Sequence, residues 1–375
     1  MANKGRLTTG IFCLFLAGLL AWHIALPDRA RSETENRTLA QFPDFSLETL
    51  KNGSFTAGME DYFADQFPLR DDWTGLKARC EQLLGKREFN GVYLCGDTLI
   101  AKVDEPDRLQ AEKNLDYVKR FGEASHGRVL LGLIPSAAEV WKDRLPQGAP
   151  SFDQAAFIQN AAEKTGLPTV DLLGALTEHA GEPIYYRTDH HWNNIGSYRG
   201  YREAAALLGC TDLLEPLETA RVDNHFSGSK ALLTGAQEQF FEPMDLYRFA
   251  FPNMSVTIAG EPADDYGRQD AALSGQIAGA SYSGIYGNDD GEIILDTGTA
   301  GRGNLLMIGE SYDNAILKLI AAHFDRVYSV DLRSYEQDMG KPFRMAEYLR
   351  EHDITKVLWI GSLMFYTSDV FTLED

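Results

Sequence analysis

The sequence predicts an α/β fold in which helices cover both faces of a parallel sheet. Near-continuous apolar runs occupy residues 128–134, 304–308, 326–330 and 356–360, as expected for strands that are buried on both faces. Segments with helical spacing of apolar residues separate these runs. Hydrophobic residues make up 44% of the 375-residue chain, which is enough for a large packed core.

The N-terminus has the pattern of a segment that enters a membrane. Lys4 and Arg6 precede an uncharged run over residues 7–26, and a bilayer is crossed by about 17–25 residues. We expect residues 1–6 to be a cytoplasmic n-region and 7–26 to be a single transmembrane anchor in the cell membrane. A cleaved signal segment, which would give a secreted protein, is the alternative. Both readings place the rest of the chain outside the cytoplasm, because the positive charges stay inside.

Residues 27–104 are predicted to form a juxtamembrane linker followed by a helical and hairpin region. The first part of this stretch, 27–52, is polar and irregular. Residues 46–85 place apolar side chains at helical spacing, among them Met59, Tyr62, Phe63, Phe67 and Trp73. Residues 85–104 alternate around Gly96-Asp97, which predicts a β-hairpin with its turn at this dipeptide.

Residues 105–375 are predicted to form the α/β domain, with an insertion over 211–303 that is rich in Gly, Asp and Tyr. Before the insertion we expect a helix at 107–123, a strand at 128–134, a helix at 151–164, a short strand at 168–172 and a helix at 193–208. After it we expect a strand at 304–308, a helix at 312–323, a strand at 326–330, a helix at 342–351 and a strand at 356–360. Chemistry in such folds lies beyond the carboxyl ends of the strands.

Charge and cysteine content exclude several classes of function. The formal net charge is −20 and no basic stripe offsets it, so we expect no binding to nucleic acid. The four cysteines, Cys13, Cys80, Cys95 and Cys210, form no CxxC motif and have no spacing typical of metal ligands. A Cys80–Cys95 disulfide remains open at this point, but a disulfide scaffold is not indicated.

The stretch from Tyr185 to Asn194, YYRTDHHWNN, concentrates residues that carry chemistry. Asp189 lies two residues before His191, so its carboxylate can hold one ring nitrogen while the other faces a reactant. His190 points to the opposite side of an extended segment. Metal binding by these three side chains is the alternative, but no HExxH motif or distant Cys/His cluster completes a site. We therefore predict neither a metal nor a cofactor.

A candidate nucleophile follows the apolar run at 304–308. Ser311 comes after Gly309 and Glu310 and precedes a predicted helix. The glycine permits a tight turn, and the N–H groups at a helix N-terminus stabilise developing negative charge. The alternative role for Ser311 is an ordinary helix N-cap.

The segment YYRTDHHWNNIGSY resembles the signature of the DHHW family of bacterial exported proteins. It is also similar to the Asp-x-His-Trp motif of the alginate O-acetyltransferase family of the AlgJ/AlgX type. Glu35-Asn36-Arg37, Pro43 and the run from Tyr62 to Arg70 fit the N-terminal region of the same family, so the resemblance covers roughly residues 30 to 365. It implies a permuted SGNH-hydrolase-like, flavodoxin-like fold in which the Asp-x-His pair precedes the serine.

Carried over by position, the resemblance implies Ser311 as the nucleophile, His191 as the general base and Asp189 as the residue that orients the base. The usual Gly-Asp-Ser motif is Gly309-Glu310-Ser311 in this chain, which adds a methylene beside the nucleophile.

Four further residues are candidates for binding. SGNH hydrolases use a glycine and an asparagine for the oxyanion, and Asn288 is our candidate for the asparagine. Arg333 binds substrate, braces the site or forms a surface salt bridge. Trp192 and Tyr312 are candidates for stacking on sugar rings, or are packed core, as are Tyr185, Tyr186 and Tyr335.

The resemblance implies an extracytoplasmic O-acyltransferase, expected to carry acetyl, that modifies a cell-surface or exported polysaccharide through an acyl-serine. It also implies a membrane-bound O-acyltransferase as the partner that donates the acyl group. A carbohydrate acetyl esterase with the same triad is one alternative, because water can replace the sugar hydroxyl. A non-catalytic glycan-binding or assembly scaffold is the other.

Overall fold

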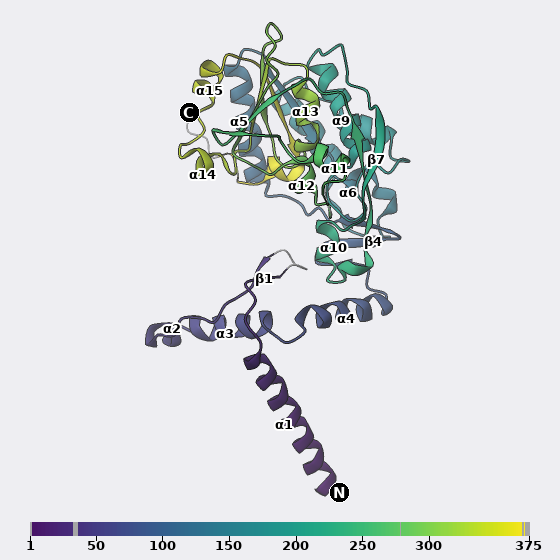
Figure 1. Ribbon diagram of the computed structural model, residues 1–375, viewed down its shortest axis with the longest axis vertical. Coiled ribbons are helices and arrows are strands. Elements are labelled where there is room, and N and C mark those ends of the chain that lie inside the picture. The colour runs from purple at the N-terminus through teal and green to yellow at the C-terminus, as the bar shows by residue number, and fades with distance from the viewer. Residues whose placement is uncertain (1, 33–36, 278, 370, 372–375) are drawn as a thin grey trace. The chain divides into compact units, whose positions relative to one another are not determined.

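The structure, a computed structural model, describes residues 2–32, 37–277, 279–369 and 371 (Figure 1). Glu35 and Asn36 of the N-terminal motif lie outside this range. By its internal contacts the chain divides into two compact units, Met1–Asn90 with Ala231–Phe240 and Gly91–Lys230 with Phe241–Asp375. In this division the hairpin belongs to the second unit, and residues 231–240 of the predicted insertion belong to the first.

The first unit is mostly helical. Its helices are α1 (Ala2–Ala25), α2 (Leu47–Lys51), α3 (Ser54–Asp65) and α4 (Arg70–Leu83), with short strands β1 (Arg31–Ser32), β2 (Arg37–Thr38) and β3 (Glu88–Phe89) and the turn η2 (Gln237–Gln239). Ser46 begins α2 with a capping box, in which its hydroxyl accepts from the backbone N–H of Thr49. Within the described residues, one helix segment, Gly5–Ala25, is long and apolar enough to cross a membrane.

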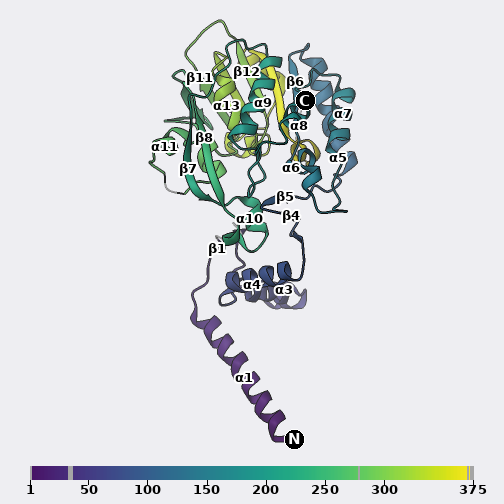
Figure 2. The same cartoon turned by 90° about the vertical axis from the view of Figure 1, so that its right-hand side faces the viewer.

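A sheet forms the centre of the second unit (Figure 2). It has seven strands, in the order β10-β9-β11-β13-β12-β14-β6. The strands are β6 (Val129–Ile134), β9 (Ser255–Ile258), β10 (Glu261–Ala263), β11 (Glu292–Asp296), β12 (Asn304–Ile308), β13 (Arg326–Val330) and β14 (Ile354–Ser362). The predicted α/β class is confirmed. The sheet is mixed, however: β6, β14, β12 and β13 run parallel, whereas β11, β9 and β10 pair antiparallel. The difference arises because the insertion supplies the three antiparallel strands.

Helices cover both faces of this sheet, as predicted. Because side chains alternate along a strand, Leu305 and Met307 of β12 pack into one core, and Leu306 and Ile308 pack into the other. The first core is closed by α8 (Leu172–Glu178), α9 (Asn194–Leu207) and α13 (Asn314–Ala321). The second is closed by α5 (Arg108–Ala124), α7 (Gln154–Thr165), α15 (Met345–Glu351) and α16 (Leu363–Thr367) (Figure 2).

Several predicted elements differ from the structure in detail. β12 and β13 have the predicted bounds, and β4 (Val92–Cys95) and β5 (Thr98–Ala101) form the hairpin, with Gly96 at a φ of 69° in its turn. The predicted strand at 168–172 is wrong: Thr169 makes a single bridge to Leu131. The reason is local, because the Asp171 side chain accepts from the N–H of Gly174 and begins α8.

The remaining elements lie around the sheet and in the insertion. They are α6 (Ala137–Val140), η1 (Lys142–Arg144), β7 (Glu218–Phe226), α10 (Ser229–Leu233), β8 (Glu242–Arg248), α11 (Gln269–Leu273), α12 (Tyr282–Tyr286) and α14 (Tyr335–Met339). β7 and β8 form a separate antiparallel pair. All four cysteines are free, so the Cys80–Cys95 disulfide left open by the sequence is not formed.

Candidate active site

Ser311 lies beyond the carboxyl end of β12, at the turn that leads into α13. The N–H of Asp313 donates to the carbonyl of Glu310 at 2.8 Å and closes this turn. A Cβ atom on Gly309 would lie 2.2 Å from a carboxylate oxygen of Asp313 and 2.5 Å from the carbonyl oxygen of Ile360. The turn that presents Ser311 therefore requires glycine at position 309.

Replacing Gly309 by alanine is expected to destabilise the second unit. The added methyl must displace a backbone carbonyl as well as a side chain, and such overpacking costs about 1–3 kcal/mol in free energy of unfolding. Urea denaturation measures the change. Gly181→Ala is the matched control, since its Cβ meets nothing within 4 Å. Equal stability of the two variants would contradict the close approach at Gly309.

The stretch that contains Asp189 and His191 is a tight loop held by its own backbone. Tyr185 bridges Trp192, and the N–H of Tyr186 donates to the carbonyl of His191 at 3.2 Å. Trp192 is completely buried, and its indole N–H donates to the carbonyl of Tyr312 at 2.9 Å. This bond joins the loop to the residue that follows Ser311.

Small residues on α9 make room for the indole ring of Trp192. A Cβ on Gly200 would lie 2.5 Å from that ring, and a Cβ on Gly196 would lie 2.1 Å from the carbonyl oxygen of Ile184. The helix itself begins at Asn193, whose side-chain oxygen accepts from the backbone N–H groups of residues 195 and 196. The sequence NNIGSYRG thus forms a capped helix with a flat face on which the loop rests.

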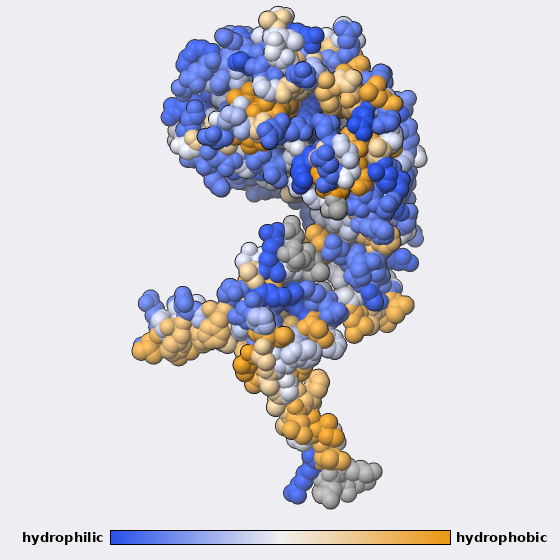
Figure 3. All heavy atoms as spheres, viewed as in Figure 1, coloured by the Kyte–Doolittle hydropathy of each residue, from blue (hydrophilic) through white to orange (hydrophobic). Residues whose placement is uncertain are grey.

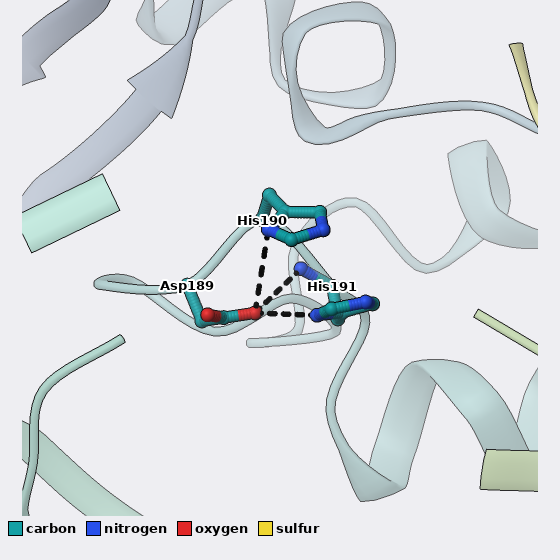
Figure 4. Close-up of side chains that lie close together, drawn as sticks. All are labelled: Asp189, His190 and His191. Atoms are coloured by element: carbon teal, nitrogen blue, oxygen red, sulfur yellow. Dashed lines mark hydrogen bonds and ion pairs between the residues drawn. The ribbon is translucent and has the colours of Figure 1, made fainter. Parts of the chain in front are cut away.

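Asp189, His191 and Ser311 form a continuous hydrogen-bonded chain. Nδ1 of His191 lies 2.6 Å from Oδ1 of Asp189, and Nε2 of His191 lies 2.7 Å from Oγ of Ser311. Since an ionised carboxylate only accepts, Nδ1 carries the proton and Nε2 is left to accept from the serine hydroxyl. Asp189 and His191 are both buried (Figure 4). This order of donors can move a proton from the serine to the imidazole.

The Asp189 carboxylate is stabilised as an anion. Burial alone would raise its pKa, but the hydrogen bond and charge of His191 outweigh burial and hold the pKa below its ordinary value. The second oxygen accepts from the backbone N–H of Ser229 at 2.8 Å. A Cβ on Gly228 would lie 2.3 Å from the Cβ of Asp189, so glycine lets this segment approach the carboxylate.

Two buried charged residues hold the backbone of the loop by hydrogen bonds. Neither of them was predicted from the sequence. The ammonium of Lys230 donates to the carbonyls of Tyr186 and Leu99, and burial lowers the pKa of Lys230 to about 8. The carboxylate of Glu242 accepts from the backbone N–H groups of Arg187 and Thr188 at 2.9 and 2.7 Å. Neither residue lies near the motif in sequence, so only the fold reveals these contacts.

Tyr282 of α12 was also missed. Its ring stacks on His191 with 3.6 Å between centroids and 2° between planes. The stacked ring restricts the imidazole to the plane in which both of its nitrogens meet their partners. Tyr282 lies in the insertion, and no spacing in the sequence connects it with the motif.

His190 takes a separate path from His191. Its Nδ1 lies 2.7 Å from the hydroxyl of Ser229, and its ring lies 3.8 Å from Oδ1 of Asp189 (Figure 4). Asp189, His190 and His191 are close enough together to be considered as metal ligands. However, the hydrogen bonds to Asp189 and Ser311 already use both nitrogens of His191. Only Asp189 and His190 of this cluster are then left as metal ligands, fewer than the three protein ligands of a typical catalytic zinc site.

Glu310, the departure from the usual Gly-Asp-Ser motif, reaches two groups. One carboxylate oxygen lies 3.1 Å from the oxygen of the Ser311 hydroxyl, whose proton is donated to His191, and the other accepts from the N–H of Ser362 at the end of β14 at 2.8 Å. The longer side chain therefore connects the nucleophile turn to the neighbouring strand.

The other predicted residues are placed differently. Arg333 forms salt bridges with Asp331 and, at 2.8 Å, with Asp289. The Asn288 side chain is exposed, and the described structure gives it no hydrogen bond to Ser311. The backbone around it lies beside α13, because the side-chain amide of Asn314 donates to the carbonyls of Gly287 and Asn288 at 3.3 and 3.5 Å.

The aromatic candidates are core residues. Trp192 has no exposed surface, and Tyr312 is 4% exposed. The hydroxyl of Tyr312 donates to the carbonyl of His190. Their burial argues against sugar stacking, since neither ring has a free face. The same holds for Tyr185, Tyr186 and Tyr335, which are buried as well.

Comparison with known proteins relates this geometry to two families. Residues 102–257 match the family model described as "SGNH hydrolase-like domain, acetyltransferase AlgX", and residues 35–125 match the model described as "DHHW protein". The first match contains Asp189 and His191, whereas Ser311 lies beyond both.

Curated relatives and solved structures agree with these matches. The chain is 25% identical over 214 residues to the "Probable alginate O-acetylase AlgJ" of Pseudomonas fluorescens, which covers 53% of this chain and 51% of the relative. It is 24% identical over 185 residues to the protein of the same name from Pseudomonas syringae pv. tomato, which covers 46% of this chain and 47% of the relative. The chain therefore spans about half the length of the curated relatives it matches.

Two solved structures share the fold. A DHHW family protein from Eubacterium siraeum is 20% identical, with a TM-score of 0.61 over 75% of this chain and 94% of that one. Bacillus cereus PatB1 with a sulfonyl adduct is 19% identical, with a TM-score of 0.60 over 76% of this chain and 98% of that one. The resemblance predicted from the sequence is thus confirmed: residues 35–125 are similar to the DHHW proteins, and residues 102–257 are similar to the SGNH hydrolase-like, AlgX-type acetyltransferases.

Proposed function

We propose that this chain is an extracytoplasmic O-acetyltransferase that modifies a polysaccharide through an acetyl-serine on Ser311. The observation that supports the proposal most directly is the chain of hydrogen bonds from Asp189 through His191 to Ser311, at 2.6 and 2.7 Å. This is the arrangement of acid, base and nucleophile that acyl transfer requires.

The mechanism has two half-reactions. His191 Nε2 takes the proton of Ser311 as Oγ attacks the carbonyl carbon of an acetyl ester, and N–H groups at the turn before α13 stabilise the oxyanion. The imidazolium then protonates the leaving alcohol, and acetyl-Ser311 remains. In the second half, His191 deprotonates a sugar hydroxyl that attacks the acetyl group, and the serine leaves with the proton returned to it. Asp189 keeps its charge throughout and stabilises the imidazolium.

The substrate and location are proposed from the relatives. The AlgJ proteins are named as probable alginate O-acetylases, so we propose a polysaccharide hydroxyl as the acceptor. We propose that α1 anchors the chain in the cell membrane with both units outside, since Gly5–Ala25 has the length and composition of a span. An acyl donor must then reach the outer face, and a membrane-bound O-acyltransferase is the proposed partner that supplies it.

To test this proposal, the purified full chain is incubated with a chromogenic acetyl ester and oligosaccharides. Acetylated oligosaccharide and free acetate are then measured. We expect acetylated oligosaccharide to form in proportion to added acceptor, with free acetate falling correspondingly. Release of acetate alone, at a rate that is independent of every oligosaccharide tried, would favour a carbohydrate acetyl esterase. A wild-type protein that is inert towards several esters but binds oligosaccharides would favour the glycan-binding scaffold.

A further inference from the structure

The helices that follow α1 expose large apolar side chains in unusual number. Between residues 42 and 84 these are Phe42, Phe45, Leu47, Leu50, Phe63, Phe67, Leu69, Trp73, Leu76, Leu83 and Leu84. Figure 3 shows hydrophobic residues gathered along one side of α2 and α3, with polar residues on the opposite side. A contiguous apolar surface of this kind marks a site of contact with a protein or a membrane.

α4 shows that this surface is turned away from the rest of its unit. Leu69, Trp73, Leu76, Cys80 and Leu83 recur at intervals of three and four residues and so share one face of the helix. Trp73 is 53% exposed and Leu83 is 88% exposed. This exposed face is named the α4 stripe below.

The opposite face of α4 is the one that packs against protein. Gly75 and Ala78 are buried there, and the segment 231–240 lies against them: Gly235 approaches both Gly75 and Ala78. Arg79 pairs with Glu238 of the same segment. An amphipathic helix normally buries its apolar side, so a helix that packs by its small residues and exposes its leucines has a second contact outside the unit.

The end of α1 fixes where this surface lies relative to a bilayer. Nδ1 of His23 lies 3.1 Å from the carbonyl oxygen of Gln66, and the His23 ring contacts Tyr62 and Phe63 of α3 with centroids 5.4 and 5.0 Å apart. His23 belongs to the last turn of the apolar segment Gly5–Ala25. α3 therefore lies at the level where α1 leaves the hydrocarbon region.

The residues after α1 also contact the start of α4 and hold it close to the end of α1. The side chain of Gln66 accepts from the N–H of Arg29 and donates to its carbonyl, both at 2.9 Å, and Arg29 pairs with Asp71 at 2.8 Å. The four Cα-to-Cα steps from Ala25 to Arg29 span at most about 14 Å even when the chain is fully extended. Both ends of the loop between α3 and α4 are thus held close to the membrane exit of α1.

We propose that α2, α3 and the α4 stripe lie in the interface of the lipid bilayer and insert their exposed Phe, Leu and Trp side chains among the acyl chains. The proposal rests on the membrane placement of α1 given above. Lipid fits this surface better than a separate protein, because the surface is continuous with the end of the apolar span Gly5–Ala25.

The charge of α4 predicts which lipids the proposed membrane contact needs. In α4 the acidic residues Asp71, Asp72 and Glu81 equal in number the basic residues Arg70, Lys77 and Arg79, so the helix has no net positive charge to attract anionic lipid. Binding therefore depends on buried apolar area, and phosphatidylcholine alone is expected to suffice at any salt concentration.

Cys80 provides a native probe, since it is exposed on the α4 stripe. The full chain, with Cys13, Cys95 and Cys210 changed to serine, is spin-labelled at Cys80 and reconstituted into phosphatidylcholine vesicles. We expect the nitroxide to collide more often with oxygen than with a water-soluble nickel complex. A label at Glu112→Cys, on an exposed position of α5, is expected to give the reverse order.

A double substitution on the proposed contact and a control substitution on α5 distinguish a lipid contact from a general change in the protein. Leu83→Ser with Leu84→Ser is expected to increase nickel access at Cys80 several-fold, because both side chains are largely exposed and their loss leaves the fold unaffected. Leu109→Ser on α5, with 79% exposure, is the matched control and is expected to change nothing at Cys80.

A Cys80 label that is as accessible to nickel as the Glu112 label in vesicles would overturn the proposal and favour a protein partner for this surface. Failure of the full chain to float with the vesicles would overturn it too. Neither measurement depends on acyl transfer, so the proposed function and the proposed membrane contact are tested separately.

Discussion

Ser311→Ala and His191→Ala are each expected to lower kcat for acetyl-ester turnover by roughly 10⁴-fold or more. The first removes the atom that forms the acyl intermediate, and the second removes the acceptor 2.7 Å from it. Because the two groups act as a unit, the double variant is expected to lose little more than either single variant. Burst-phase acetate release and steady-state rates with a chromogenic ester measure both effects.

Ser283→Ala is the matched control for the serine substitution, since Ser283 lies exposed on α12. It is expected to retain full activity. Urea denaturation of all variants checks that the fold is unchanged. Two single variants whose losses multiply in the double variant would contradict a shared step, and loss only in His191→Ala would point to a different nucleophile.

Asp189→Asn is expected to cost about 10²–10⁴ in kcat/KM, because the amide no longer fixes the tautomer or stabilises the imidazolium. The residue keeps its size, so the close packing of Gly228 against it is preserved. The pH profile provides the discriminating readout. Once the neighbouring negative charge is lost, the protonated imidazole is less stable, and the acid limb of the kcat/KM profile moves to lower pH.

Asp212→Asn, at an exposed position, is the control for this substitution and is expected to leave the profile unchanged. A loss of activity in Asp189→Asn that comes with lower stability and an unshifted acid limb would assign Asp189 a structural role. A positioning role requires the shift.

The parts of this fold that depend on the pattern of residues within one short segment were predictable. The apolar runs of β12 and β13 indicate strands clearly, since four consecutive apolar or small residues before a glycine or an aspartate suit a buried strand. The spacing of Asp189 and His191 within one loop likewise expresses a geometric requirement, because a carboxylate two residues away reaches the imidazole. Sequence reasoning also paired these residues with Ser311, which the structure brings within hydrogen-bonding distance.

What escaped prediction depends on contacts between distant segments. The stacking of Tyr282 on His191, and the support that Lys230 and Glu242 give to the loop, join residues whose own surroundings in the sequence look ordinary. The antiparallel half of the sheet was missed for a related reason. β9, β10 and β11 are short and lie in a polar insertion, so their pairing is set by the exposed edge of β13. For the aromatic residues near the motif, the sequence left stacking on sugars and packing in the core as alternatives, and their burial favours the core.

The position of β14 has a consequence for how the protein acquires its structure. This strand, among the last in the chain, pairs with β12 on one side and β6 on the other, and it is the element that joins them. Until residues 354–362 are available to pair, the two halves of the sheet have no common partner, and pairing over such long separations is slow. The sheet of the second unit is therefore completed only when this strand inserts between β6 and β12. In the meantime, the unpaired edges of β6 and β12 would be exposed to aggregation.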